Sequence, residues 1–261
     1  MAPRTRFPCF TGWCLLLTWM SPLTGQQVNK LTPAEQAAGF RLLFDGKSFR
    51  GWKQQGNWTI VERALYRGRA GGGLTCVAQP IPDDFELRFQ WKVARGSNSG
   101  VYYRPGQYEY QILDNAVHVD GKNPRTSAAS LYFCMAPSRD VTRPAGKWND
   151  GRIVCQGSII QHWLNGQKVI DFDYTDKRWS QSVALLKKRG GTLSARGRQL
   201  FLQDHGDPVW YRTIRLRTIS KTETILHKTV QPASIPPEIR KAEEEKLRRI
   251  IENRRRQKAA P

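Results

Sequence analysis

The sequence predicts an all-β protein, an antiparallel sandwich or jelly roll, with a short helix before it and a helical tail after it. Short runs of alternating apolar and polar residues, separated by turn residues, recur from about residue 40 to residue 220. Two of these runs are joined by Asn165-Gly166. This dipeptide accepts positive φ at both central positions of a type I′ hairpin turn, so the two runs are predicted to pair as antiparallel strands.

The first 25 residues are typical of an export signal. Arg4 and Arg6 form a basic start, the run 13–20 (WCLLLTWM) is apolar, and small and turn residues follow up to Gly25. A membrane span needs about 20 apolar residues, and this run is shorter. We therefore predict a signal peptide over 1–25, a protein of the periplasm or extracellular space, and no membrane span after cleavage. An uncleaved anchor is the alternative.

A short helix is predicted directly after the signal. Thr32 is suited to cap it, Pro33 to occupy its first turn, and Glu35, three residues after the cap, to complete a capping box. Strands follow, and their alternation is clearest over 85–93, 101–104, 108–113, 159–164, 168–174 and 210–219. The predicted sandwich spans 39–220.

A linker over 221–237 and a basic helical tail over 238–261 follow the predicted sandwich. The apolar positions of the tail form only a narrow stripe. Favourable i,i+4 pairs are Glu244–Arg248, Glu245–Arg249 and Glu252–Arg256. We interpret the tail as a solvated helix packed weakly on the sandwich. The alternative is a basic arm that contacts acidic polymer or membrane headgroups.

The net charge of +20 and the hydrophobic content of 39% narrow the function classes. This fraction of hydrophobic residues is too high for a globally disordered chain. The basic excess is spread along the chain, which favours non-specific attraction to polyanions. Because none of the usual nucleic-acid-binding motifs is present, we predict no specific nucleic-acid partner.

Cysteine usage also excludes one kind of site. Of five cysteines, two would leave with the signal and three remain, so at most one disulfide forms. No CxxC or Cys/His cluster supports structural zinc. The three remaining cysteines are Cys76, Cys134 and Cys155, and the last two lie in apolar strand patterns that predict burial.

Four stretches of the chain carry a family resemblance. They are 40–52 (FRLLFDGKSFRGW), 97–120 (SNSGVYYRPGQYEYQILDNAVHVD), 144–169 (PAGKWNDGRIVCQGSIIQHWLNGQKV) and 200–217 (LFLQDHGDPVWYRTIRLR). In this order they resemble the signature blocks of the 3-keto-disaccharide hydrolase domain. The resemblance implies a concanavalin-like jelly roll, export, and hydrolysis of 3-keto-glucosides.

Polar groups gather on and after the predicted strand 108–113. A period of two puts Glu109 and Gln111 on one face of this strand and its core-like residues on the other. Asp114, Asn115 and His118 follow directly. These groups are more than strand stability needs, so we interpret them as site residues. The alternative for Asp114 and Asn115 is that they only shape a turn.

Two further stretches contribute to the candidate site. Arg104 ends the preceding strand and would lie close to Glu109 if the two strands form a hairpin. If the strand continues through residue 205, its alternation places Gln203 and His205 on the face opposite the core residues Leu200 and Leu202. The candidate catalytic residues are therefore Glu109, Asp114, His118 and His205, and the candidate substrate-binding residues are Arg104, Gln111, Asn115 and Gln203.

The implied substrate suggests a route that differs from that of ordinary glycosidases. A ketone at C3 acidifies the proton at C2, so a base can remove it and the C1 substituent can leave by elimination, after which water adds. Such a site needs a base, an electrophile at the ketone oxygen and an acid for the leaving group. His118 or Glu109 would serve as the base, and Arg104 or a bound metal as the electrophile. His118, His205, Glu109 and Asp114 would also suit a divalent ion as ligands.

Two other functions fit the same predicted fold. One is a non-catalytic carbohydrate-binding module, since jelly rolls serve both roles. The other is an interaction protein of the cell envelope that uses the basic tail. The cluster of titratable groups favours the enzyme.

Overall fold

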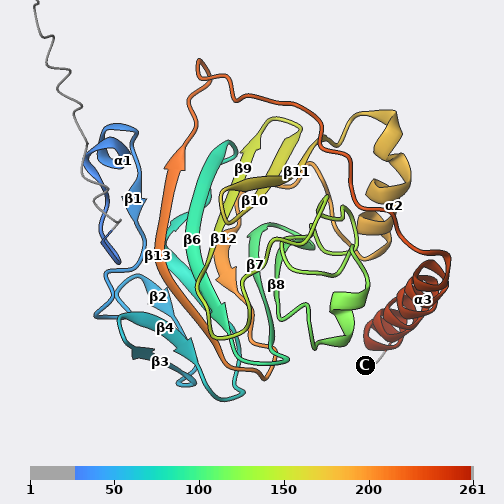
Figure 1. Ribbon diagram of the computed structural model, residues 1–261, viewed down its shortest axis with the longest axis horizontal. Helices are drawn as coiled ribbons and strands as arrows, with labels where there is room; N and C mark the ends of the chain where they lie inside the picture. The colour runs from blue at the N-terminus through green and yellow to red at the C-terminus, as the bar shows by residue number, and fades with distance from the viewer. Residues whose placement is uncertain (1–26, 260–261) are drawn as a thin grey trace, which may run out of the picture.

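Two antiparallel β-sheets pack face to face in the computed structural model, which describes residues 27–259 (Figure 1). The predicted all-β sandwich is confirmed. The predicted signal peptide lies outside the described residues. Across 27–259, no helix is both long enough and apolar enough to cross a membrane.

The larger sheet has the strand order β11-β10-β9-β6-β13-β4-β3, and β1 pairs with β13 at the side. All of its pairings are antiparallel. Its strands are β1 (Arg41–Leu42), β3 (Trp58–Val61), β4 (Ala64–Arg67), β6 (Phe85–Val93), β9 (Asn149–Gln156), β10 (Ile159–Leu164), β11 (Gln167–Asp173) and β13 (Val209–Thr218).

The smaller sheet has the strand order β2-β5-β12-β7-β8. Chain segments distant in sequence meet in it, since β12 lies between β5 and β7. Its strands are β2 (Trp52–Lys53), β5 (Leu74–Pro80), β7 (Asn98–Arg104), β8 (Tyr108–Leu113) and β12 (Gln199–Leu202).

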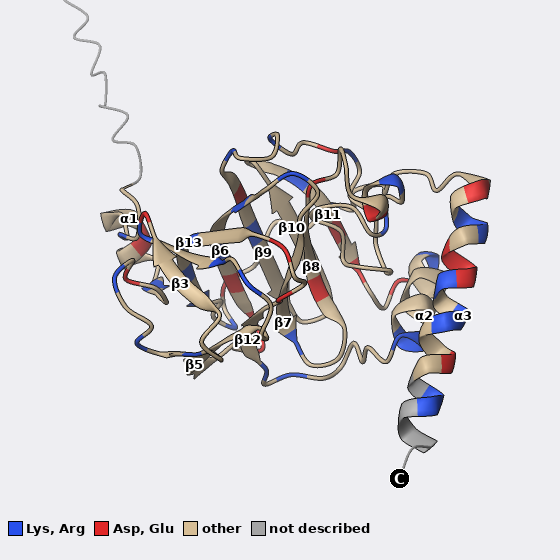
Figure 2. Ribbon diagram, turned by 90° about the horizontal axis from the view of Figure 1, so that it is seen from below, with Lys and Arg blue, Asp and Glu red and all other residues tan. Residues whose placement is uncertain are grey.

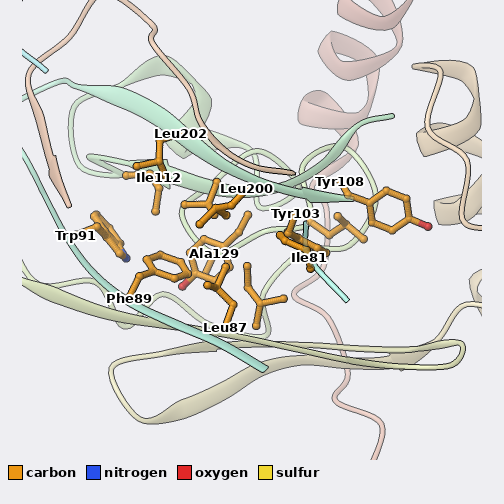
Figure 3. Close-up of a cluster of buried hydrophobic side chains, with 14 of the residues drawn as sticks. Ile81, Leu87, Phe89, Trp91, Tyr103, Tyr108, Ile112, Ala129, Leu200 and Leu202 are labelled. Carbon is orange, nitrogen blue, oxygen red and sulfur yellow. The ribbon is translucent and has the colours of Figure 1, made fainter. Parts of the chain in front are cut away.

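The core fills the space between the two sheets. Phe89 of β6 meets Tyr110 of β8 edge to face, with ring centroids 5.3 Å apart. Each large apolar side chain buried in this way contributes about 1.5–3 kcal/mol. The side chains that meet there include Leu87, Phe89 and Trp91 from the larger sheet and Tyr103, Ile112, Leu200 and Leu202 from the smaller one (Figure 3).

The short N-terminal helix and the hairpin form as predicted. Helix α1 (Pro33–Ala37) begins after Thr32, which accepts a hydrogen bond from Glu35 N, while the Glu35 carboxylate accepts one from Thr32 N. Asn165 and Gly166 have φ of 49° and 79°, as the type I′ turn between β10 and β11 requires.

Helical segments and an ordered connection also lie outside the sheets. Helix α2 (Ser180–Lys188) follows the 3-10 turn η2 (Lys177–Trp179), and neither was predicted. The 3-10 turn η1 (Val119–Lys122) lies in the long segment between β8 and β9. The predicted linker runs along β11 with hydrogen bonds to it, for example Val230 N to Asp171 O at 2.9 Å.

Helix α3 (Pro237–Ala259) lies at the opposite end of the molecule from α1 (Figures 1 and 2). Acidic and basic residues recur along the coloured part of this helix (Figure 2). Cys76, Cys134 and Cys155 are all buried free thiols, and burial raises the pKa of Cys134 to about 12.

Candidate active site on the outer face of the smaller sheet

Glu109 lies on the face of β8 that points away from the core. Its neighbours Tyr108, Tyr110 and Ile112 belong to the core, as alternation predicts. The segment between β8 and β9 (114–148), which forms no regular strand, covers the outer edge of β8 and is called the covering segment below. Tyr132 N donates to Glu109 O at 3.1 Å, and Gln111 N donates to Ser130 O at 3.2 Å. Glu109 is therefore enclosed from the side and is only 3% exposed.

The Glu109 carboxyl group has a direct partner on β7. Tyr102 lies opposite Glu109 in the strand register, and its hydroxyl donates to Glu109 Oε2 at 2.8 Å. Burial raises the pKa of Glu109 to about 7, although the nearby Arg189 charge and the Tyr102 hydrogen bond both lower it. A carboxyl group with this pKa is about half ionised at neutral pH, which suits a general base.

Gly100 makes room for this carboxyl group. It lies on β7 opposite Gln111, and a Cβ atom there would lie 2.3 Å from Glu109 Oε1 and 2.9 Å from Glu109 Cγ. Any side chain at position 100 would therefore push the carboxyl group out of its place.

Amide side chains surround Glu109 on two further sides. With its amide nitrogen turned toward Glu109, Gln111 donates to Glu109 Oε1 at 3.1 Å; turned the other way, it donates to Asn98 Oδ1 at 3.3 Å. Gln203, which follows β12, donates from Nε2 to the Tyr102 hydroxyl at 3.3 Å. Within the described chain its buried Oε1 has no hydrogen-bond partner. These amides can form hydrogen bonds with hydroxyl or carbonyl groups of a sugar.

His118 lies at one side of this group, half-buried. Its Nδ1 accepts from Asp120 N at 3.1 Å, so the neutral ring carries its proton on Nε2. The Nε2 atom lies 3.5 Å from Asn98 Nδ2. The Nε2 edge of the imidazole thus faces the side-chain amide of Asn98.

Tyr132, Asp120 and Arg189 form the wall beside Glu109. The Tyr132 hydroxyl donates to Asp120 Oδ2 at 3.0 Å. Arg189, just after α2, lies over the Tyr132 ring at 4.5 Å and donates to Tyr132 O at 3.1 Å. Burial and the negative charges of Asp120 and Glu109 raise the pKa of Tyr132, so its hydroxyl stays protonated at neutral pH.

Arg104 does not join this group, contrary to the sequence-based expectation. The register between β7 and β8 shifts between Tyr102 and Arg104, and the extra residue of such a bulge reverses the alternation. The Arg104 guanidinium consequently lies on the core side, 6.0 Å from the Phe85 ring centroid, and donates to Asp83 O at 2.9 Å. Arg189 is the arginine whose charge acts on Glu109.

Asp114 and Asn115 hold loops together. Asp114 Oδ2 accepts from Gly96 N at 2.7 Å, and its Oδ1 accepts from Ala116 N at 3.3 Å. Asn115 Oδ1 accepts from Ala128 N at 2.8 Å. These contacts match the turn-shaping alternative and leave both residues at the margin of the site.

His205 lies on the exposed loop that follows Gln203. The residues beside it hold that loop in place. Asp207 Oδ2 accepts from Asn98 N at 3.0 Å, and Asp204 accepts from Gly71 N and Gly72 N at 2.8 and 2.7 Å. The loop therefore adjoins Asn98, with His205 itself facing solvent.

A metal centre made of Glu109, Asp114, His118 and His205 does not fit this geometry. Throughout 27–259, no group of three or more His, Cys, Asp or Glu side chains is placed to hold a metal ion. The Asp114 oxygens are occupied by backbone N–H groups, and His205 faces solvent.

Sequence reasoning missed Tyr102, Tyr132 and Arg189. The signal for Tyr102 was present, because strand pairing in a tight hairpin places it opposite Glu109. Tyr132 and Arg189 come from irregular segments whose position depends on the tertiary fold, and no periodicity marks them.

Comparisons with known proteins agree with the fold and bear on the chemistry. Residues 39–217 match the model of the 3-keto-alpha-glucoside-1,2-lyase-like domain. A 3-keto-disaccharide hydrolase of Bacteroides thetaiotaomicron is 27% identical, in an alignment that covers 78% of this chain and 86% of that protein.

Solved structures show the same fold. A "putative glycosyl hydrolase" from Parabacteroides distasonis superposes with a TM-score of 0.64 at 23% identity, covering 74% of this chain and all of that one. A second protein of that description from the same organism has a TM-score of 0.55 at 23% identity, covering 69% of this chain and 99% of the other.

Proposed function

This chain belongs to the family of 3-keto-alpha-glucoside-1,2-lyase-like domains. We propose that it hydrolyses the glycosidic bond of 3-keto-glucosides by elimination followed by hydration. The observation that carries the proposal is the buried Glu109 carboxyl group, whose pKa is raised to about 7. A base of this pKa is matched to an acidified C–H bond at neutral pH.

The first step is removal of the proton at C2. The Glu109 carboxylate takes this proton, and the electron pair of the C2–H bond passes toward the C3 ketone to give an enolate. The amides of Gln111 and Gln203 lie around the carboxyl group and can hydrogen-bond the developing oxyanion. The Tyr102 hydroxyl holds the Glu109 carboxyl group in place.

The second step breaks the C1–O bond. The enolate electrons form a C1=C2 double bond while the leaving oxygen takes a proton. His118 is the candidate acid, because its ring lies beside the amides around Glu109 and its charged form can donate a proton from Nε2. Water then adds at C1 and gives a proton to His118. Glu109, whose proton exchanges with solvent water once the leaving group has departed, protonates C2, so the net reaction is hydrolysis.

Turnover of matched substrates tests the proposal. The purified full-length protein should cleave a 3-keto-glucoside and should leave the same glucoside with an ordinary C3 hydroxyl intact, because without the ketone the C2 proton is not acidic. Cleavage of both at comparable rates would overturn the elimination route. Binding of the 3-keto-glucoside without turnover would instead favour a non-catalytic carbohydrate-binding module.

Export to the periplasm or extracellular space is part of the same proposal. It rests on the basic start, the apolar run 13–20 and the small residues up to Gly25 in the sequence. Determining the N-terminus of the protein recovered outside the cytoplasm tests it, and the expected N-terminus lies close after residue 25.

A further inference from the structure

Helix α3 lies outside the matched family domain, which ends at residue 217, yet it contacts the wall beside Glu109. Lys246 Nζ donates to Asp120 Oδ1 at 2.6 Å and to the Tyr132 hydroxyl at 3.1 Å. Since Tyr132 also donates to Asp120 Oδ2, the three side chains form a closed group.

A second ion pair holds the same face of α3. Glu243, three residues before Lys246, is 4% exposed. Its carboxylate lies 2.6 Å from Arg125 Nη1 and accepts from Asn123 Nδ2 at 3.2 Å. Leu247 is buried beside them, at 6% exposure. Residues three and four apart share a helix face, so α3 is docked by this face in a fixed register.

The Lys246 charge acts on the site in two ways. It neutralises Asp120, whose negative charge raises the pKa of Glu109, and it lowers the pKa of Glu109 itself. The charged and titratable groups that act on Glu109 are Tyr102 of β7, Arg189 after α2, Asp120 and Tyr132 of the covering segment, Tyr211 of β13, and Lys246 of α3.

We propose that Lys246 is a positioning residue of the active site and that α3 therefore contributes to the structure of this site. Lys246 fixes Asp120 and Tyr132 as the wall beside Glu109, through hydrogen bonds to both. The role of this wall in turnover rests on the proposed function, whereas its effect on Glu109 does not.

The test compares Lys246→Met with Lys241→Met in the full-length protein. Lys241 is exposed on the same helix and serves as the matched control. We expect kcat/KM for a 3-keto-glucoside to fall roughly 10-fold in Lys246→Met, which corresponds to about 1.4 kcal/mol of transition-state stabilisation. We also expect the rising limb of its pH profile to move to higher pH. Lys241→Met should match the wild type, and Lys246→Arg should retain most of the activity.

A direct titration of Glu109 separates this inference from the proposed function. The 13C resonance of the Glu109 carboxyl carbon, identified by its loss in Glu109→Gln, should titrate at a higher pH in Lys246→Met than in the wild type, because a nearby positive charge is removed. That result supports the inference even if the wild type turns over no 3-keto-glucoside, an outcome that would refute only the proposed function. An unchanged titration in Lys246→Met, or full activity of this variant, would overturn the inference.

Discussion

Gly100 and Glu109 share one small space on the outer face of the smaller sheet. A Cβ atom at position 100 would lie 2.3 Å from Glu109 Oε1, so the absence of a side chain on β7 lets the carboxyl group of β8 lie against the strand, within reach of the Tyr102 hydroxyl. The position of the candidate base thus depends on a residue with no functional group of its own.

Gly100→Ala should reduce activity more than stability. The added methyl group meets the end of a flexible side chain, so the carboxyl group can move while the backbone stays in place. We expect at least a roughly 10-fold loss of kcat, since a displacement of about 1 Å costs up to about 100-fold. Steady-state kinetics and thermal unfolding of the purified variant check this. Wild-type kinetics in a folded Gly100→Ala protein would show that the place of the Glu109 carboxyl group does not matter.

Glu109→Gln should lower kcat by about 100-fold or more at neutral pH, the usual loss when general-base help is removed. Glutamine has nearly the same size and can still accept from Tyr102, so the fold should persist. Kinetics with a 3-keto-glucoside, alongside circular dichroism to confirm folding, measure the effect. Retention of more than about a tenth of the activity would rule out Glu109 as the base.

Folding stability should report the raised pKa of Glu109 independently of catalysis. Between about pH 4.5 and 7 the folded protein keeps the Glu109 proton while the unfolded chain releases it, so the free energy of unfolding falls as pH rises through this window. The expected loss is on the order of 3 kcal/mol, at about 1.4 kcal/mol per pKa unit. Urea denaturation at pH 5 and pH 8 should show it in the wild type relative to Glu109→Gln. Equal changes in both proteins would contradict the prediction.

Glu243→Ala should destabilise the protein by about 1–3 kcal/mol, because it leaves the partly buried Arg125 guanidinium without its partner. At roughly 2–4 °C per kcal/mol, Tm should fall by roughly 2–12 °C. Glu244→Ala, at an exposed position of the same helix, is the control and should leave Tm nearly unchanged. A Glu243→Ala protein as stable as the control would mean that α3 is not anchored through this pair.

Local patterns predicted the strands well because burial on one face imposes a period of two. The bounds expected for β6, β8 and β10 agree with the structure to the residue. The same period placed Glu109 and Gln111 on the outer face of β8. Where the pattern breaks, the prediction failed: the bulge after Tyr102 turned Arg104 toward the core.

The rest of the site depends on contacts between distant segments. Arg189 and Lys246 are about 80 and 137 residues from Glu109 along the chain, and neither belongs to a strand of the sandwich. In the sequence, α3 has only a narrow apolar stripe and many charged residues, which predicts a helix packed weakly on the sandwich. The ion pairs of Glu243 with Arg125 and of Lys246 with Asp120 cannot be predicted from the helix alone. They depend on the position of the covering segment relative to α3 in the folded protein.

The central claim, that C2 loses its proton before the C1–O bond breaks, is tested most directly by turnover in D2O. The account predicts that the 3-keto-glucose product carries deuterium at C2, seen by mass spectrometry as a gain of one mass unit, and by NMR as loss of the C2 proton signal. A control incubation of the product with the enzyme measures exchange after release. Product that forms at full rate with hydrogen retained at C2 would contradict elimination and indicate direct displacement at C1.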